Sequence, residues 1–349
     1  MNKNRSEILK IVRRAVQLSF PKASNIAIRD VQLIKTAMAW KSVVLRARCS
    51  LFVNGRGQTF DLFGGWDKEN PASKKRAYKT IKHLWMNGFS IAPHLVPQPL
   101  LFDQKTSLLL YVSYSGETLY NLLRRKKNDD FKRLISLIGS WTAGLHSLRT
   151  KNIVPRLNDT DDKLQHKRNC ATFSGNGFSF FQKKISPQSL NISNTVFKQR
   201  RLIRRQLKTL SLIHNDLHIR NILTNERRDE IAVIDFNESR LHDPLDDVAA
   251  FLVHLDVELA RFFPKQTVFD FQKTFLRAYL SKRKKKISAD EVQRLSVHAA
   301  WTGLRFLQYT LESNPPFPHR HFFKKSLCLI EERFWEIAIN PGEFLKPLL

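Results

Sequence analysis

Four polar residues whose side chains can do chemistry lie within one short, otherwise apolar stretch, "LIHNDLHIRNILTNERRDEIAVIDF" (residues 212–236). They are His214, Asp216, Asn221 and Asp235. The segments "NIL" and "IAVIDF" predict two short buried strands joined by the turn "NERRDE". Because a hairpin brings its two ends together, we expect Asn221 and Asp235 to meet at one edge, with Asp216 close by.

Two oxygen ligands beside a third carboxylate are typical of a site for a hard cation. Magnesium binds few protein oxygens and completes its coordination with water and substrate phosphates. Asn221 and Asp235 would hold the metal, and Asp216 would accept the proton of a hydroxyl nucleophile, which predicts phosphoryl transfer from a nucleotide. The alternative is a polar loop whose Asp and Asn residues only cap turns. We favour the site because all four residues occur in order between predicted strands.

The elements that must position these residues change along the chain. From residue 25 to 112 the pattern is mostly that of strands. Two predicted strands, "VVLRARCSLFV" and "QTFDLF", flank the turn "NGRG". They are followed by a predicted helix, "NPASKKRAYKTIKHLWMNGF", and by a further strand, "SLLLYVSY". After Gly116 apolar residues recur at helical spacing, whereas residues 151–194 are polar and predict irregular structure. The chain therefore predicts an α+β fold with a small strand-rich N-lobe and a larger helical C-lobe.

These patterns divide the chain into three segments. Residues 1–22 predict a basic amphipathic helix, residues 23–113 the N-lobe that binds the nucleotide, and residues 114–349 the C-lobe with the catalytic loop and the substrate-binding helices. We expect the first helix to pack on the domain. The alternative is a helix that lies on a membrane surface.

The composition narrows the class of partner. The 349 residues include 59 Lys and Arg against 31 Asp and Glu, a formal net charge of +28, which predicts attraction to nucleic acid, an anionic membrane surface or a phosphorylated substrate. Three widely spaced cysteines argue against a disulfide framework and a zinc site, so we expect a cytoplasmic location. The N-terminus lacks the apolar run of a signal peptide, and no stretch is long and apolar enough to span a bilayer.

The segment "HNDLHIRNIL", followed by "VIDF", resembles the Brenner motif of the aminoglycoside phosphotransferase and choline kinase group, relatives of the protein kinases. "WTAGLH" and "HDPLDDVAAFL" are also similar to segments of that family, and the resemblance covers residues 40–310. It implies a two-lobed protein-kinase-like fold and an ATP- and magnesium-dependent kinase whose acceptor is an alcohol group. Asp216 would be the catalytic base, and Asn221 and Asp235 would bind magnesium.

The resemblance also assigns roles around the catalytic loop. His214 would brace the loop, and Asp247 would hydrogen-bond it from the next helix. His218 stands where many protein kinases have Lys. Arg220 either reaches the transferred phosphate or forms a surface pair with an Asp or Glu, and both alternatives stay open.

One charged residue of the family pattern is missing. Kinases hold the α- and β-phosphates with a Lys on the third strand, paired to a Glu on the next helix. Here Gly64 and Gly65 stand where that Lys is expected, and the following helix has basic residues but no Glu. We expect Lys79 of that helix, or Lys68 before it, to supply the charge; otherwise ATP binding is weak or the chain is a pseudokinase. Because the base and both metal ligands are present, we favour an active enzyme.

The charge of the chain bears on the acceptor. Basic clusters flank the catalytic segment at Arg124–Lys127, Lys198–Lys208 and Lys282–Lys286. An aminoglycoside or choline needs an acidic pocket, so we expect an anionic small molecule, sugar or lipid-linked glycan instead. The alternative is a degenerate kinase fold that binds a polyanion such as RNA, with the aromatic residues of "FSFFQKK" as stacking platforms. The clusters would also allow peripheral contact with the inner membrane surface.

Overall fold

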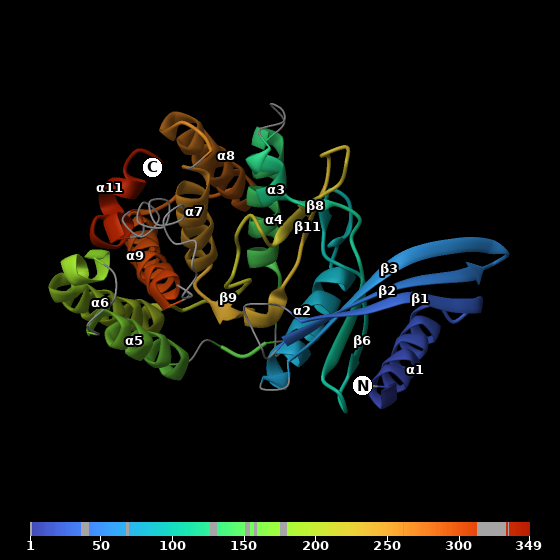
Figure 1. The fold of residues 1–349 in the computed structure, drawn as a ribbon. Helices are drawn as coiled ribbons and strands as arrows, with labels where there is room; N and C mark the ends of the chain where they lie inside the picture. The colour runs from blue at the N-terminus through green and yellow to red at the C-terminus, as the bar shows by residue number, and fades with distance from the viewer. Residues whose placement is uncertain are drawn as a thin grey trace. The chain divides into compact units, whose positions relative to one another are not determined.

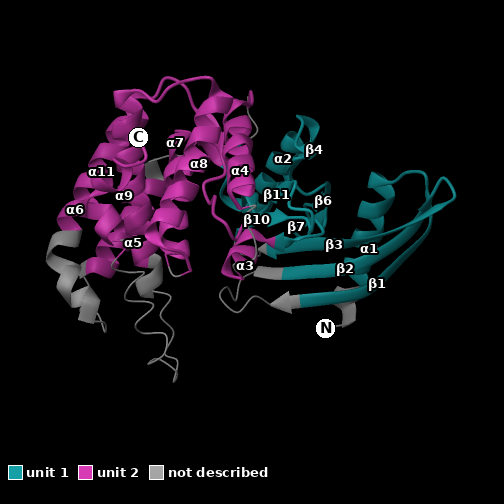
Figure 2. Ribbon diagram, turned by 90° about the horizontal axis from the view of Figure 1, so that it is seen from above, with its two compact units in different colours: residues 1–117, 152–154, 222–239 teal, residues 118–151, 155–221, 240–349 magenta. Residues whose placement is uncertain are grey.

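The structure is a computed structural model, and it describes residues 2–35, 42–67, 70–125, 131–150, 154–156, 159–174, 180–260, 262–312, 333 and 335–349. Figure 2 shows its two compact units: unit 1 comprises residues 1–117, 152–154 and 222–239, and unit 2 comprises residues 118–151, 155–221 and 240–349. The sequence predicts that the N-lobe ends at residue 113 and the C-lobe begins at residue 114. The observed division is not made by a single cut in the chain, because residues 222–239 belong to the same unit as the N-terminal residues.

A five-stranded antiparallel sheet is the main part of unit 1 (Figure 1). In spatial order its strands are β1 (Ala23–Lys35), β2 (Ser42–Val53), β3 (Arg56–Asp67), β7 (Leu108–Val112) and β6 (Pro99–Asp103). The two-residue turn between β2 and β3 consists of Asn54 and Gly55, whose φ angles are +50° and +77°. Asn and Gly adopt such angles more readily than other residues, so the hairpin predicted from "NGRG" is confirmed.

Helix α1 (Asn2–Ser19) covers one face of this sheet. Val12, Ala15 and Val16 are fully buried, and they share a hydrophobic core with Leu45 of β2 and Leu62 of β3. The removal of this apolar surface from water stabilises the contact. The expectation that the N-terminal helix packs on the domain is confirmed.

Helix α2 (Pro71–Met86) follows β3 and begins with a well-formed cap. The side chain of Asn70 accepts a hydrogen bond from the backbone N–H of Ser73 at 3.2 Å, and Pro71 occupies the first helical position. Unit 1 also contains the smaller sheet, whose strands in spatial order are β4 (Ser90–Ile91), β5 (His94–Leu95), β11 (Ile231–Val233), β10 (Ile222–Thr224) and β8 (Glu117–Thr118), which ends at the unit boundary. The short 3-10 helix η1 (Phe236–Glu238) follows β11.

Unit 2 is mainly helical. Its described helices are α3 (Leu119–Arg124), α4 (Phe131–Ser147), α5 (Asp159–Ser174), α6 (Phe180–Gln206), α7 (Leu245–Leu259), α8 (Lys265–Arg283), α9 (Ala289–Glu312) and α11 (Pro341–Leu345). The strands β9 (Ser211–Ile213) and β12 (Arg240–His242) pair antiparallel, and β9 leads into the catalytic loop. Within the described ranges, no helix has the length and apolar character needed to cross a membrane.

The prediction of irregular structure over residues 151–194 is wrong, because α5 and α6 occupy most of this segment. Their contact is built partly from buried charge. Arg200 of α6 donates a hydrogen bond to Asp162 of α5 at 3.2 Å, and both residues are almost completely buried. Polar residues on the inner faces of both helices remove the apolar periodicity on which the prediction depended.

Candidate active site

The predicted catalytic loop, residues 214–221, lies in unit 2 and is held by helix α7. The carboxylate of Asp247 accepts hydrogen bonds from the backbone N–H groups of His214 at 2.7 Å and Asn215 at 2.8 Å, as predicted. His146 of α4 lies 3.1 Å from the same carboxylate. The imidazole of His214 is fully buried, and its Nδ1 accepts a hydrogen bond from the backbone N–H of Asp216 at 3.3 Å. These contacts fix the direction in which the Asp216 backbone runs.

The structure brings Asp216 and Asn221 together. The side-chain nitrogen of Asn221 donates to the backbone oxygen of Asp216 at 3.0 Å and to its Oδ2 at 3.1 Å. Because these contacts use only the nitrogen of the amide, Oδ1 of Asn221 is the atom left to bind a metal ion. The expected proximity of Asp216 and Asn221 is therefore present in the loop.

Two neighbouring side chains, His218 and Arg305, act on the Asp216 carboxylate. Burial by itself raises the pKa of Asp216, but the hydrogen bond and charge of His218, together with the charge of Arg305, outweigh burial and hold this pKa well below its ordinary value. His218 Nε2 lies 3.6 Å from Asp216 Oδ2. Arg305 of α9 donates to the backbone oxygen of Asn215 at 3.5 Å. Asp216 is thus ionised throughout the neutral pH range.

Arg220 is engaged by neighbouring side chains. Its Nε lies 3.1 Å from Glu258 Oε2 of α7, and its guanidinium carbon lies 3.7 Å from the centre of the Tyr120 ring. Of the two alternatives left open by the sequence, the ion pair with an acidic residue is the one that the structure contains. A contact between Arg220 and the transferred phosphate stays a prediction.

Asp235 lies in unit 1, directly after β11. Strands β10 and β11 pair antiparallel with Ile222 opposite Val233, which confirms the predicted hairpin. The residues expected to bind the metal, Asn221 and Asp235, therefore flank the same end of this hairpin, although their expected meeting stays a prediction. The carboxylate of Asp235 is exposed and accepts a hydrogen bond from the side chain of Asn237.

The backbone of Asp235 has a φ angle of +66°. This left-handed conformation is uncommon for residues other than glycine, and such residues cluster at functional sites. Among the described residues, no group of three or more His, Cys, Asp or Glu side chains could hold a metal ion by itself. Magnesium does not need such a group, because one carboxylate and one amide oxygen suffice when substrate phosphates and water complete its coordination.

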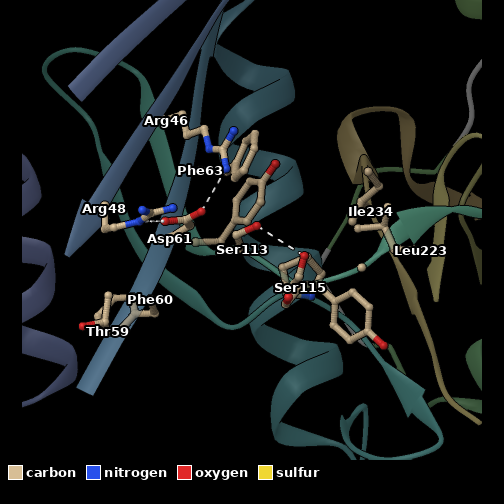
Figure 3. Close-up of a pocket in the computed structure, with 14 residues that line it drawn as sticks. Arg46, Arg48, Thr59, Phe60, Asp61, Phe63, Ser113, Ser115, Leu223 and Ile234 are labelled. Carbon is tan, nitrogen blue, oxygen red and sulfur yellow. Dashed lines mark hydrogen bonds and ion pairs between the residues drawn. The ribbon is translucent and has the colours of Figure 1, made fainter. Parts of the chain in front are cut away.

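Unit 1 contains a cavity of about 780 Å³ beside the sheet, a size within the usual range of ligand sites. Phe63 of β3 and Tyr111 of β7 line it, and their rings stack at 6.5 Å. Leu223 and Ile234 lie on the side of the cavity opposite Phe63 (Figure 3). Residues 113–116 also line the cavity. Flat apolar and aromatic surfaces on two sides suit a planar ring such as a nucleobase.

The sheet side of the cavity is also charged. Asp61 of β3 pairs with Arg46 of β2 at 3.0 Å and with Arg48 at 2.9 Å (Figure 3). The hydrogen bonds from Arg48 and Arg46 lower the pKa of Asp61. The alternation of "RAR" and "FDLF" places these three side chains on one face of the sheet, so the sequence contained a signal for them. That signal did not reveal that the face lines a cavity.

Neither lysine expected to replace the missing strand residue has a contact that tests its role. The side chain of Lys79 is exposed on α2. Lys68 lies outside the described residues. The same helix provides another cation, Arg76, which donates to the backbone oxygen of Asn237 at 2.8 Å and so links α2 to the segment that carries Asp235.

Two basic clusters predicted to attract polyanions are partly neutralised within the protein. In the cluster Lys198–Lys208, Arg200 and Arg204 form ion pairs with Asp162. In the cluster Lys282–Lys286, Arg283 and Lys285 both pair with Glu291. Lys126 and Lys127, and the aromatic side chains of "FSFFQKK", lie outside the part of the chain whose side chains the structure describes.

Comparison with known proteins identifies the family. The family model described as "Phosphotransferase enzyme family" matches residues 66–289, which is more than half of the chain, so the chain belongs to this family. The resemblance drawn from the sequence is thereby confirmed. No curated protein sequence matches the chain.

Solved structures with similar folds are kinases and phosphotransferases. Amicoumacin kinase hAmiN has a TM-score of 0.59 and 14% identity, over 97% of this chain and 96% of that chain. An ethanolamine kinase of Plasmodium vivax has a TM-score of 0.56 and 11% identity, over 88% and 82%. Aminoglycoside 2′-phosphotransferase-IIIa has a TM-score of 0.54 and 18% identity, over 93% and 98%. At these identities the likeness shows the fold, and the predicted protein-kinase-like α+β fold is confirmed.

Proposed function

We propose that this chain transfers the γ-phosphoryl group of a nucleoside triphosphate to a hydroxyl group of a small molecule. The observation that carries the proposal is the catalytic loop, in which an ionised Asp216 lies beside Asn221 on a backbone held by Asp247. Amicoumacin kinase with this fold was solved with AMP-PNP and Ca²⁺, and the aminoglycoside phosphotransferase with GDP. We therefore infer a nucleotide donor with a divalent cation, ATP with Mg²⁺ being the first choice.

In this reaction the acceptor hydroxyl donates a hydrogen bond to the carboxylate of Asp216. The hydroxyl oxygen forms a bond to the γ-phosphorus, the bond from that phosphorus to the bridging oxygen breaks, and the hydroxyl proton passes to Asp216. A nucleoside diphosphate leaves with the electron pair of the broken bond. Because the transition state of phosphoryl transfer is loose, a carboxylate of low pKa that orients the hydroxyl is sufficient.

The nucleotide would be held by residues of the loop, of the segment after β11 and of the cavity in unit 1. Asn221 and Asp235 would hold the magnesium ion, which offsets the charge of the phosphates when it is bound. The cavity between Phe63, Tyr111, Leu223 and Ile234 would hold the nucleobase. In the proposed site the protein contributes positioning and charge, and it forms no covalent intermediate.

The surroundings of Asp216 favour an anionic acceptor. The guanidinium group of Arg305 acts on the Asp216 carboxylate as a positive charge. Within the described part of the chain, Arg305 forms no ion pair with a carboxylate, so its charge is available to a ligand. A cationic acceptor such as an aminoglycoside would be repelled by this group, whereas a phosphorylated or carboxylated sugar would be attracted.

Two substitutions test the proposed chemistry. Asp216→Asn keeps the size of the side chain but removes its negative charge, so turnover should be lost while nucleotide binding is retained. Asp235→Asn removes a metal ligand, so both nucleotide binding and turnover should fall. Release of nucleoside diphosphate in the presence of an acceptor panel measures turnover, and a fluorescent nucleotide measures binding. Wild-type protein that binds no nucleotide with Mg²⁺ or Mn²⁺ would favour the pseudokinase or polyanion-binding alternative, and equal turnover by wild type and Asp216→Asn would reject the base.

A further inference from the structure

Strand β3 lacks a side chain at the point where a kinase needs a cation. Successive side chains of a strand point to opposite faces, so Gly65 lies on the face that carries Asp61 and Phe63, both of which line the cavity. Gly64 lies on the other face, where an added Cβ would stand 2.7 Å from Cδ2 of Leu110. Packing therefore accounts for Gly64, whereas Gly65 leaves space on the cavity face.

The side chain of Lys74 reaches this space from helix α2. A Cβ placed on Gly65 would lie 3.5 Å from Nζ of Lys74 and 3.7 Å from its Cε. The ammonium group thus lies directly against the β3 backbone, where the stem of a strand lysine would begin. A longer side chain at residue 65 would compete for this position.

The orientation of α2 separates Lys74 from the other lysines of the helix. Lys74 is half-buried, whereas Lys75 and Lys79 are exposed. Ala77 and Ile81 lie three and seven residues beyond Lys74, on the same side of the helix, and both are buried in unit 1. Lys74 is therefore held against the sheet by the packing of its own helix face.

The charge of Lys74 is not used within the described part of the chain. The whole of α2 is described and contains no acidic residue, and within the described residues Lys74 has no hydrogen bond or ion pair. Kinases pair their strand lysine with a helix glutamate, and both members of that pair are absent here. An ammonium group held in place without a carboxylate partner is suited to an anionic ligand.

The same helix is tied to the segment that carries Asp235. Arg76, two residues after Lys74, donates to the backbone oxygen of Asn237 at 2.8 Å, and Asn237 contacts the Asp235 carboxylate. Helix α2, which carries Lys74, is thus linked to the proposed metal ligand Asp235 within unit 1 through Arg76 and Asn237.

We propose that Lys74 is the phosphate-binding cation of the nucleotide site, delivered from helix α2 to the position that a strand lysine would otherwise occupy. This inference rests on the proposed function. The ligand atoms are the α- and β-phosphate oxygens of a nucleoside triphosphate. The lysine and the glutamate of the usual pair are replaced by one lysine on the helix and a glycine on the strand.

The first test removes the charge and keeps the length of the side chain. Lys74→Met should raise the dissociation constant and the KM for the nucleotide about tenfold or more, since a hydrogen bond to a charged group is lost. Lys75→Met is the matched control, because Lys75 is an exposed lysine on the same helix, and it should bind nucleotide as the wild type does. Lys79→Met and Lys68→Met are measured beside it as the remaining candidates.

The second test returns the lysine to the strand. The double variant Lys74→Met, Gly65→Lys places an ammonium group in the vacated space, so it should recover a large part of the nucleotide affinity lost in Lys74→Met. Thermal unfolding of each variant without nucleotide identifies a folding defect, in which case Lys74→Gln replaces Lys74→Met. Nucleotide affinity of the Lys74 variant equal to that of the wild type would overturn the proposal, as would weak binding that Gly65→Lys does not improve.

The two proposals fail in different ways. A wild type that binds neither ATP nor GTP in the presence of Mg²⁺ would reject the proposed function itself. A wild type that binds and turns over nucleotide, together with a silent Lys74→Met, would reject only the role of Lys74. If Lys68→Met or Lys79→Met is then the damaging change, the cation comes from that residue.

Discussion

The carboxylate of Asp247 accepts a hydrogen bond of 2.7 Å from the backbone N–H of His214. Its other oxygen accepts one of 2.8 Å from the backbone N–H of Asn215, and the whole side chain is buried. Asn215 has a φ angle of +64°, an uncommon conformation that needs support from its surroundings. Helix α7 therefore determines the shape of the loop that presents Asp216.

We expect Asp247→Ala to destabilise the protein and to reduce turnover together. The change leaves two buried N–H groups without acceptors, and each costs ~1–3 kcal/mol. Urea unfolding should show the loss of stability, and kcat should fall more than the nucleotide KM rises. Asp270→Ala is the control, because Asp270 is a partly exposed residue whose ion pair with Lys132 is worth at most about 1 kcal/mol. Equal stability of the two variants would contradict the role of Asp247.

Replacement of Arg305 tests the charge of the acceptor. Arg305→Gln removes a positive charge near Asp216, so the KM for an anionic acceptor should rise about tenfold, and the KM for a neutral one should change little. Arg277→Gln is the control, because Arg277 is an exposed residue on α8 and its replacement removes the same positive charge at a distance from the loop. An acceptor panel of paired neutral and phosphorylated sugars provides the measurement. If both acceptors respond equally to Arg305→Gln, the substitution has altered the loop and the anionic-acceptor proposal loses its support.

The buried charges around Arg200 predict a loss of stability in acid. Burial alone raises the pKa of Asp246, but the charges of Arg200 and His298 outweigh it and hold this pKa well below its ordinary value. A carboxyl group with a depressed folded-state pKa stabilises the protein above its unfolded-state pKa, and this stability is lost as the pH falls toward the folded-state value. The free energy of unfolding should therefore decrease as the pH is lowered below about 4.

Asp246→Asn separates this effect from general acid denaturation. At pH 7 the variant should be less stable by ~3–5 kcal/mol, because Arg200 is left buried with one of its carboxylates removed. Its stability should also change less than that of the wild type as the pH is lowered. Urea unfolding at several pH values gives both quantities, and parallel pH profiles for the two proteins would show that Asp246 does not carry the linkage.

The sequence predicts those parts of the site that depend on neighbours along the chain. Asp216 and Asn221 are five residues apart, so one loop can bring them together, and the hairpin from Ile222 to Val233 follows from its strand and turn composition. Arg305 reaches the loop only through the packing of α9 in unit 2. Ninety residues separate it from Asn215, and no local pattern marks it.

The sequence does not single out Lys74, the cation that we propose, for a related reason. The basic run "KKR" offers several cations within one turn of helix, and the one that reaches Gly65 depends on how α2 is rotated on the sheet. Successive residues of a helix are about 100° apart, so a rotation of that size would exchange Lys74 for its neighbour. The α5 and α6 helices were missed because buried ion pairs such as Arg200 with Asp162 replace the apolar stripe that predicts a helix.

The close contact between α4 and α8 makes Gly139 a sensitive position. A Cβ on Gly139 would lie 2.4 Å from the backbone oxygen of Phe275 and 3.0 Å from the Cβ of Ala278. Backbone atoms cannot move aside without a shift of the whole helix, so Gly139→Ala should destabilise the protein by ~1–3 kcal/mol. This loss competes with the better helix propensity of Ala, about 1 kcal/mol relative to Gly, and we expect the overpacking to dominate.

Gly342 provides the matched control for Gly139. It lies in α11, and a Cβ there would meet no atom within 4 Å, so Gly342→Ala should leave stability unchanged or raise it by up to about 1 kcal/mol. Helix α4 also carries His146, which contacts Asp247, so a displaced α4 should lower kcat as well. Urea unfolding and turnover of both variants test this. A Gly139→Ala protein with wild-type stability would show that α4 and α8 separate at little cost, and the predicted loss of turnover would then be dropped too.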